Sequence, residues 1–232
     1  MNKFPSDESS ERIFPGGRNK IILYISVSAA LILFILTWIF VSSGLLSSTD
    51  AEILKSLRVA ENPSRPAGPA WCLIFFKSIT FLGNEILLAV FVLATAVYFY
   101  TIKRKDFTLL IIMSALGGSI LETILKEIIK RPRPEIVPYL VVPYWWSFPS
   151  GHAVMSVTVY LLFFIIISSF INVRQIKVLI LTLAAVFVFL IGFSRIYLGV
   201  HYPTDIIAGW SVGCFWVSLC LLWYRSKKKI FK

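Results

Sequence analysis

The sequence has 232 residues, of which 57% are hydrophobic and 15% are charged, and its mean hydropathy is +0.80. Soluble domains carry about 45 to 50% apolar and about 25% charged residues, so this composition excludes an ordinary soluble protein and indicates a membrane protein. The 23 Lys and Arg against 12 Asp and Glu give a net charge of +11, but these basic residues lie mostly in short loops and tails, which argues against nucleic-acid binding.

Six apolar segments predict an all-α, polytopic membrane protein with six transmembrane helices, because each is close to the roughly 20 residues that cross a bilayer. The segments cover residues 21–43, 85–102, 107–125, 151–171, 178–193 and 204–224. The stretch 71–82 contains Lys77 and is predicted to form an interfacial helix between the first two spans. Residues 1–20 are predicted to be a disordered cytoplasmic tail and residues 225–232 a basic cytoplasmic tail, on either side of one membrane domain over residues 21–224.

The distribution of Lys and Arg predicts the orientation of these spans. In the connections without a motif, basic residues gather in both tails, after the second span and after the fourth: Lys3, Arg12, Arg18, Lys20, Lys103, Arg104, Lys105, Arg174, Lys177, Arg225, Lys227, Lys228, Lys229 and Lys232. These four regions share one side, which the positive-inside rule makes cytoplasmic. The connections 48–84, 126–150 and 194–203 then face outward, although basic residues in the first of them weaken this assignment. Four outward cations require another explanation: Lys130, Arg131, Arg133 and Arg195.

The first polar cluster follows the third predicted span. Lys126 and Arg133 are seven residues apart, which places them on one helix face if the helix continues that far, while Pro132 and Pro134 favour its end nearby. Two cations directed at one point suit a phosphate, because Arg binds it through two hydrogen bonds and Lys as a point charge. A basic stop at the membrane interface is the alternative for this cluster taken alone.

The second polar cluster opens the fourth predicted span. Ser150 is a favourable N-cap residue, and Gly151 allows close approach of a ligand to the backbone. Free amides at a helix N-terminus form an anion-binding site, and His152 would stand beside that anion. Taken alone, Ser-Gly before a helix is also typical of a simple cap.

The third polar cluster precedes the sixth predicted span. If a helix begins near Pro203, His201 lies just before it and Asp205 lies in its first turn, where the carboxylate can hold one imidazole nitrogen and leave the other free to react. Arg195 adds a cation to Lys126 and Arg133 of the first cluster. Cations, a helix N-terminus and two histidines indicate phosphoryl transfer rather than a metal site, which would need more ligands. The three cysteines lie in apolar surroundings and lack the spacing of a metal site: Cys72, Cys214 and Cys220.

These three clusters together resemble the signature of the type-2 phosphatidic acid phosphatase superfamily, the membrane-embedded lipid phosphate phosphatases. The matching elements are Lys126-x6-Arg133-Pro134, then Pro149-Ser150-Gly151-His152, then Ser194-Arg195-x5-His201-x3-Asp205, in the family's order and spacing. The resemblance covers roughly residues 85 to 224. It implies a six-helix architecture with an extracytoplasmic site, which agrees with the orientation predicted from charge.

The resemblance also implies a mechanism that needs no metal or cofactor. His201 would be the nucleophile that forms a phosphohistidine, oriented by Asp205, and His152 would be the general acid on the departing lipid oxygen. The non-bridging phosphate oxygens would be held by Lys126, Arg133, Ser150, Gly151 and Arg195.

Glu122 is a further candidate, suggested by the residues and not by the family. It lies four residues before Lys126, which is the favourable order for a helical ion pair, so we hypothesise that it anchors Lys126. The alternative is that Glu122 faces a polar crevice or a neighbouring helix without affecting Lys126.

The function predicted from the sequence is therefore hydrolysis of a lipid phosphate or diphosphate, with the lipid substrate and the membrane lipids as partners. Undecaprenyl diphosphate, phosphatidylglycerophosphate, phosphatidic acid and a lipid A phosphate all remain open as substrates, as does the oligomeric state. A lipid phosphotransferase would use the same site, and a phosphate-binding transporter is a weaker alternative. Vanadium haloperoxidases resemble the signature as well, but the predicted spans argue against a soluble oxidant enzyme. Short loops and a compact chain suggest a bacterial inner-membrane protein.

Overall fold

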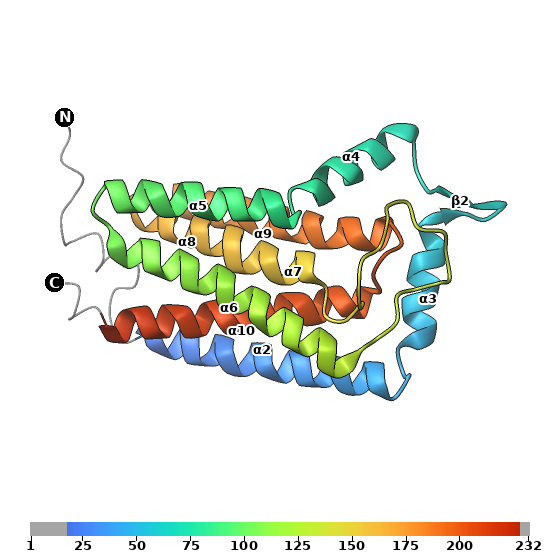
Figure 1. Cartoon of the computed structure of the whole chain (residues 1–232), viewed down its shortest axis with the longest axis horizontal. Coiled ribbons are helices and arrows are strands. Elements are labelled where there is room, and N and C mark those ends of the chain that lie inside the picture. Colours follow the sequence, from blue (N-terminus) through green and yellow to red (C-terminus); the bar gives the residue numbers. More distant parts are fainter. Residues whose placement is uncertain (1–17, 228–232) are drawn as a thin grey trace.

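The computed structural model describes residues 18–227, which form a bundle of long helices (Figure 1). Its helices are α2 (Arg18–Ser42), α5 (Glu85–Thr101), α6 (Lys105–Ile129), the continuous run of α7 (Gly151–Met155), η1 (Ser156–Leu161) and α8 (Leu162–Ser169), α9 (Arg174–Tyr197) and α10 (Pro203–Lys227). The start of α2 and the end of α10 lie at the same end of the bundle. Helix α2 begins at Arg18 and α10 continues to Lys227, so each of these helices includes the residues of a predicted tail that lie next to it. The remaining tail residues, 1–17 and 228–232, lie outside the described part of the chain.

The long helices carry the apolar surface expected of membrane spans. Within residues 18–227, five helices are long and apolar enough to cross a bilayer. Helix α4 (Ala70–Phe81) and α5 meet at a bend of 50°, and they make a sixth span if the pair is counted as one broken span. Large apolar side chains of these helices point outward, for example Ile25 at 61% exposure. Exposed apolar residues on α2, α5, α6, α9 and α10 indicate that lipid, not water, surrounds the bundle.

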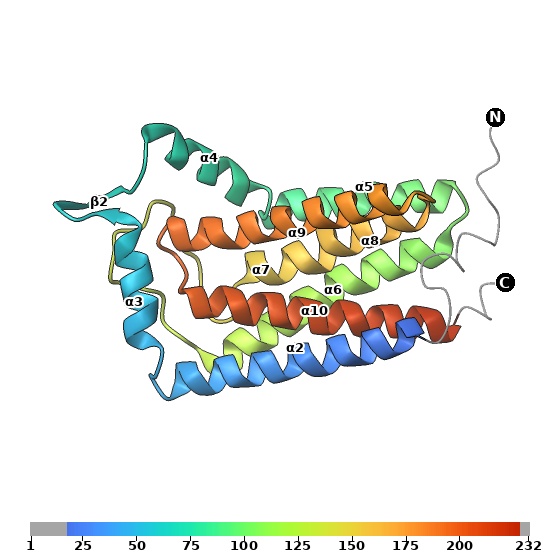
Figure 2. The same ribbon diagram turned by 180° about the vertical axis from the view of Figure 1, so that it is seen from behind.

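The end of the bundle opposite the start of α2 carries additional elements, seen from behind in Figure 2. They are α3 (Ser47–Ser56), the antiparallel strands β1 (Arg58–Val59) and β2 (Asn62–Pro66), and α4 (Ala70–Phe81). The first part of the connection predicted over 48–84 is thus a helix and a two-stranded sheet, so the fold is not entirely helical. Helix α3 packs through Asp50 and Leu54, which lie one helical turn apart, face the protein and are buried, while most of its other residues are polar.

Helix α4 coincides with the stretch that was predicted to be an interfacial helix. It exposes Trp71 and Ile74, at 63% and 69%, and turns into α5 through Leu82 and Gly83. Asn84 caps α5 by accepting hydrogen bonds from the backbone amides of Ile86 and Leu87. This capped turn lies against the start of α7, so α4 and α5 close one side of the functional site.

A π-helical segment interrupts the fourth span one turn after it begins. In η1 the backbone carbonyl of Thr158 accepts a hydrogen bond of 2.7 Å from the Ser114 hydroxyl of α6. Gly118 of α6 leaves the space that the Thr158 side chain fills, since a Cβ there would lie 2.7 Å from Thr158 Cγ2. This contact fixes the fourth span against α6 a short distance along the span from His152.

Candidate active site

The three polar clusters converge on one cavity of about 610 Å³ at the end of the bundle that carries α3 and α4. Six of the eight predicted site residues line it: Lys126, Arg133, Gly151, His152, Arg195 and His201. The other two, Ser150 and Asp205, are fully buried directly behind it. The convergence follows from the topology, because the site collects the end of α6, the start of α7, the end of α9 and the start of α10.

His201 lies in the short connection between α9 and α10, and α10 begins at Pro203, as predicted. Its Nδ1 is 3.3 Å from Asp205 Oδ2, and its Nε2 is 3.1 Å from Arg133 Nη1. An arginine only donates hydrogen bonds, so Nε2 must accept from Arg133 and the ring proton must sit on Nδ1, facing the carboxylate. The nitrogen that carries the lone pair therefore faces Arg133, and both residues line the cavity.

The surroundings of His201 keep its ring neutral. Only 1% of the residue is exposed, and burial lowers its pKa well below the ordinary value; the charges of Arg133, Arg195 and Lys126 lower the pKa further. A neutral imidazole is the form that can act as a nucleophile.

The cations around the cavity are held mainly by neutral oxygen atoms. Arg133 donates to the carbonyls of Val200 at 2.7 Å and Trp145 at 2.8 Å, and also to the carbonyl of Tyr144. Arg195 Nη1 donates to Thr80 Oγ1 of α4 at 2.8 Å. Carbonyl and hydroxyl partners orient a guanidinium without neutralising its charge, so both arginines remain available to an anion.

The connection after α6 differs from the arrangement considered in the sequence analysis. Helix α6 ends at Ile129, and Lys130 adopts a left-handed conformation with φ of 48°. Arg133 therefore does not share a helix face with Lys126; the turn and the extended residues after it carry Arg133 to the cavity instead. The two side chains still converge on the same space.

Lys126 is paired with Glu122, as hypothesised from their spacing. Its Nζ lies 2.6 Å from Glu122 Oε1, and both side chains are nearly buried. The same carboxylate lies against Gly151, where a Cβ would come within 2.6 Å of Oε1. Gly151 is thus needed for the close approach of Glu122 to the start of α7.

Ser150 occupies the N-cap position of α7, as predicted, but its side chain makes no cap hydrogen bond. Its hydroxyl is buried and has no partner within residues 18–227, and the same is true of Arg195 Nε. Buried polar groups are normally paired. Two unpaired donors around one cavity indicate a site shaped for a polar ligand.

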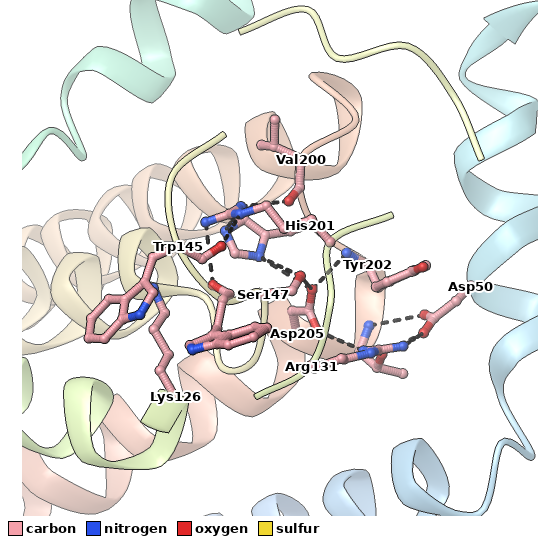
Figure 3. A network of polar contacts seen from close by, with 12 residues as sticks. Asp50, Lys126, Arg131, Trp145, Ser147, Val200, His201, Tyr202 and Asp205 are labelled. Carbon is pink, nitrogen blue, oxygen red and sulfur yellow. Dashed lines mark hydrogen bonds and ion pairs between the residues drawn. The ribbon is translucent and has the colours of Figure 1, made fainter. Parts of the chain in front are cut away.

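Three residues that the sequence analysis did not assign complete the surroundings of Asp205 (Figure 3). Ser147 Oγ donates to Asp205 Oδ2, and the Tyr202 amide donates to the same oxygen at 2.9 Å. Arg131 Nη1 donates to Asp205 Oδ1 at 2.6 Å. The sequence marked Arg131 as an outward cation in need of explanation, and this ion pair supplies one.

The donor set of the site is cationic. Among residues 18–227, no three His, Cys, Asp or Glu side chains gather as a metal site would require. The residues around the cavity instead offer guanidinium, ammonium and hydroxyl groups, which suit an anionic ligand with several oxygen atoms.

Comparison with known proteins assigns the family. Residues 107–229 match the family model of the PAP2 superfamily. Phosphatidylglycerophosphatase B of Bacillus subtilis (strain 168) is 30% identical over 177 residues, which cover 75% of this chain and 82% of that protein. The chain belongs to the PAP2 superfamily. Undecaprenyl-diphosphatase of Sulfolobus acidocaldarius is 27% identical over 122 residues, or 49% of this chain and 54% of that protein.

Solved PAP2 structures share the fold. A transmembrane PAP2-type phosphatidylglycerolphosphate phosphatase from Bacillus subtilis matches with a TM-score of 0.76 and 27% identity, over 87% of this chain and 96% of that one. Aquifex aeolicus LpxE matches with a TM-score of 0.54 and 26% identity, over 67% and 88%. The prediction of a membrane phosphatase of this superfamily is confirmed.

Proposed function

We propose that this protein hydrolyses a lipid phosphate or diphosphate at the extracytoplasmic membrane face through a phosphohistidine on His201, without a metal. The observation that carries the proposal is the orientation of His201: its Nε2 faces a cavity lined by three cations, while its Nδ1 proton faces Asp205. A neutral, oriented imidazole beside several cations provides a nucleophile and a phosphate-binding site in one place.

In the first step, His201 Nε2 attacks phosphorus and the bond to the lipid oxygen breaks. His152, which lines the same cavity and enters this step as an imidazolium, a form favoured by the negative charge of the bound phosphate, gives its proton to that oxygen, so the lipid alcohol leaves neutral. The imidazole of His201 becomes cationic as the N–P bond forms, and the Asp205 carboxylate stabilises that charge through Nδ1–H.

In the second step, a water molecule attacks the phosphohistidine. His152, now deprotonated, takes a proton from the water, the N–P bond breaks, and inorganic phosphate leaves with His201 neutral again. Each histidine returns to its starting state, so the cycle consumes water and releases one alcohol and one phosphate.

The phosphate oxygens would be bound by groups that the structure leaves available. Arg133 and Arg195 retain their charge, and the unpaired Ser150 hydroxyl and Arg195 Nε are donors without protein partners in the described chain. Lys126 would share its charge between Glu122 and the ligand. These donors surround the space beside His201 Nε2, where charge develops in the transition state.

The apolar part of the same cavity supports a lipid substrate. From the cationic end it continues between α5 and α6, along Leu88, Val92 and Ala96 on one side and Ala115 and Leu116 on the other. Such a lining fits an acyl or prenyl chain. A lipid could therefore enter from the bilayer with its phosphate placed against His201 and His152.

We infer that the termini are cytoplasmic and that the membrane is a bacterial inner membrane. The positive-inside distribution of Lys and Arg supports this orientation. The named relatives support phosphatidylglycerophosphate and undecaprenyl diphosphate as candidate substrates. Phosphatidic acid and a lipid A phosphate complete the panel.

The test is phosphate release from each of these four lipids by the purified protein in detergent, with His201→Ala as the comparison. We expect release by the wild type with at least one lipid, an acid-labile phosphoenzyme after rapid quenching, and neither with His201→Ala. Turnover by a folded His201→Ala variant would refute the nucleophile assignment. If labelled phosphate appeared in another lipid and not in solution, the protein would be a phosphotransferase.

A further inference from the structure

Helix α3, outside the residues that match the family model, contributes a buried carboxylate to the surroundings of the site. Asp50 is 2% exposed. Its Oδ1 accepts a hydrogen bond of 3.1 Å from the Thr204 amide, and its Oδ2 accepts one of 2.5 Å from the Thr204 hydroxyl. Asp50 thereby caps the start of α10, one residue before Asp205.

The same carboxylate also binds Arg131, as Figure 3 shows. Arg131 Nη2 lies 2.9 Å from Asp50 Oδ2, while Nη1 lies 2.6 Å from Asp205 Oδ1. The guanidinium packs 4.0 Å from the centre of the Tyr202 ring. Arg131 thus forms ion pairs with two buried carboxylates, Asp50 and Asp205, and Asp205 also contacts His201.

The net charge of this group bears on the chemistry at His201. Asp50 and Asp205 bring two negative charges and Arg131 one positive charge, so the trio carries a net charge of −1 next to the imidazole. Without the charge of Asp50, Arg131 would neutralise Asp205 completely. Asp205 would then stabilise a cationic His201 less well, because the attraction between nearby charges is strong in a buried site.

We propose that Asp50 is a positioning residue for the nucleophile: acting through Arg131, it keeps the Asp205 carboxylate oriented and its negative charge available to His201. This inference rests on the proposed role of His201. Neither Asp50 nor Arg131 lines the cavity, so both act on His201 through Asp205 and leave substrate binding to other residues.

The experiment compares Asp50→Asn, Arg131→Gln and the double variant. Asn at 50 keeps an oxygen for the Thr204 amide but removes the charge and the oxygen that accepts from Thr204 Oγ1 and Arg131 Nη2, which leaves the trio neutral. Gln at 131 leaves the trio at −2. The double variant returns the trio to −1. Each protein is assayed for kcat and KM with the lipid that the wild type hydrolyses, for inhibition by inorganic phosphate, and for the rate of phosphoenzyme formation.

We expect each single variant to lower kcat and the rate of phosphoenzyme formation by about ten-fold, the lower end of the effect of removing an outer partner. Asp50→Asn acts through the lost charge. Arg131→Gln removes the hydrogen bond that orients Asp205 and leaves two buried carboxylates without a cation, which favours protonation of one of them. KM and the inhibition constant of phosphate stay near the wild-type values. The double variant is faster than both single variants, because the charge beside His201 is restored. A double variant that is not faster than both would overturn the proposal, since a purely structural loss accumulates with each substitution.

A matched control lies at the opposite end of the bundle. Asp106, in the first turn of α6, is also nearly buried and paired with an arginine, Arg104, at 2.7 Å. Asp106→Asn should lower thermal stability while leaving kcat unchanged. If Asp50→Asn does not fold, Arg131→Gln carries the test, and normal kcat in a folded Arg131→Gln variant would overturn the proposal. Absence of a phosphoenzyme in the wild type would instead refute the proposed function.

Discussion

Gly83 offers a direct test of the position of His152. It lies in the turn between α4 and α5, and a Cβ at this position would stand 2.6 Å from His152 Cδ2 and 3.0 Å from Ile191 Cγ2. The turn itself is held in place, because the Tyr160 hydroxyl donates to the Leu82 carbonyl at 2.7 Å. In Gly83→Ala the His152 ring therefore moves, and the backbone does not.

The expected size of the effect follows from this geometry. An ordinary contact begins at 3.4 Å, so a ring atom now 2.6 Å from the new methyl group must move by about 0.8 Å. Misplacing a reacting group by about 1 Å can cost on the order of 100-fold in rate. We expect kcat to fall by roughly that factor, and KM to change little because the cations that bind phosphate remain in place.

The assay is steady-state hydrolysis of the preferred lipid in detergent, together with thermal unfolding of each variant. Gly118→Ala is the control, since its Cβ would come 2.7 Å from Thr158 Cγ2 and overpack the bundle in the same way. Overpacking costs about 1 to 3 kcal/mol of stability, so both variants should melt earlier, but only Gly83→Ala should lose turnover. A folded Gly83→Ala variant with normal kcat would show that His152 takes no part in proton transfer.

Three further predictions concern His201, Glu122 and metal dependence. The folded pKa of His201 lies well below that of the unfolded chain, so the unfolded state binds more protons at acid pH and stability falls as pH drops below about 6.5. Between about pH 7.5 and 5.5 the free energy of unfolding falls by about 1.4 kcal/mol for this reason, and in His201→Gln it should fall by that much less. An equal fall in the wild type and in His201→Gln would contradict a neutral His201. Glu122→Gln frees the charge of Lys126, so inorganic phosphate should inhibit roughly ten-fold more strongly while kcat falls, and unchanged values would remove the proposed anchoring. Turnover should persist in excess EDTA, and its complete loss would oppose the metal-free mechanism.

The long helices and the convergence of the three clusters could be predicted from the sequence, because both depend on local patterns. Apolar segments of spanning length located every long helix to within a few residues. Outward connections of a bundle meet at one end, so motifs placed there come together whatever the details of packing. The pairing of Glu122 with Lys126 was equally local, one helical turn apart.

The surroundings of Asp205 could not be predicted in this way, because they depend on contacts between distant segments. Asp50 lies 81 residues before Arg131, in a stretch whose polar composition suggested a loop. Only two of its residues, Asp50 and Leu54, face the protein, which is too short a pattern to distinguish a helix from a loop. The left-handed turn at Lys130 was hidden for a different reason: it depends on a single backbone angle.

Arg131 and Arg133 show how neighbouring residues of one type come to serve different purposes. They flank Pro132 in a connection that is neither helix nor strand, and their side chains have different partners. Arg131 faces two carboxylates, which neutralise it, whereas Arg133 faces carbonyl groups and His201 and keeps its charge for an anion. Loss of Arg131 would remove the ion pair of Asp205, whereas loss of Arg133 would remove one of the three cations that line the cavity. The partners therefore decide the function of each arginine: Arg133 acts on the phosphate, and Arg131 acts on the nucleophile through Asp205.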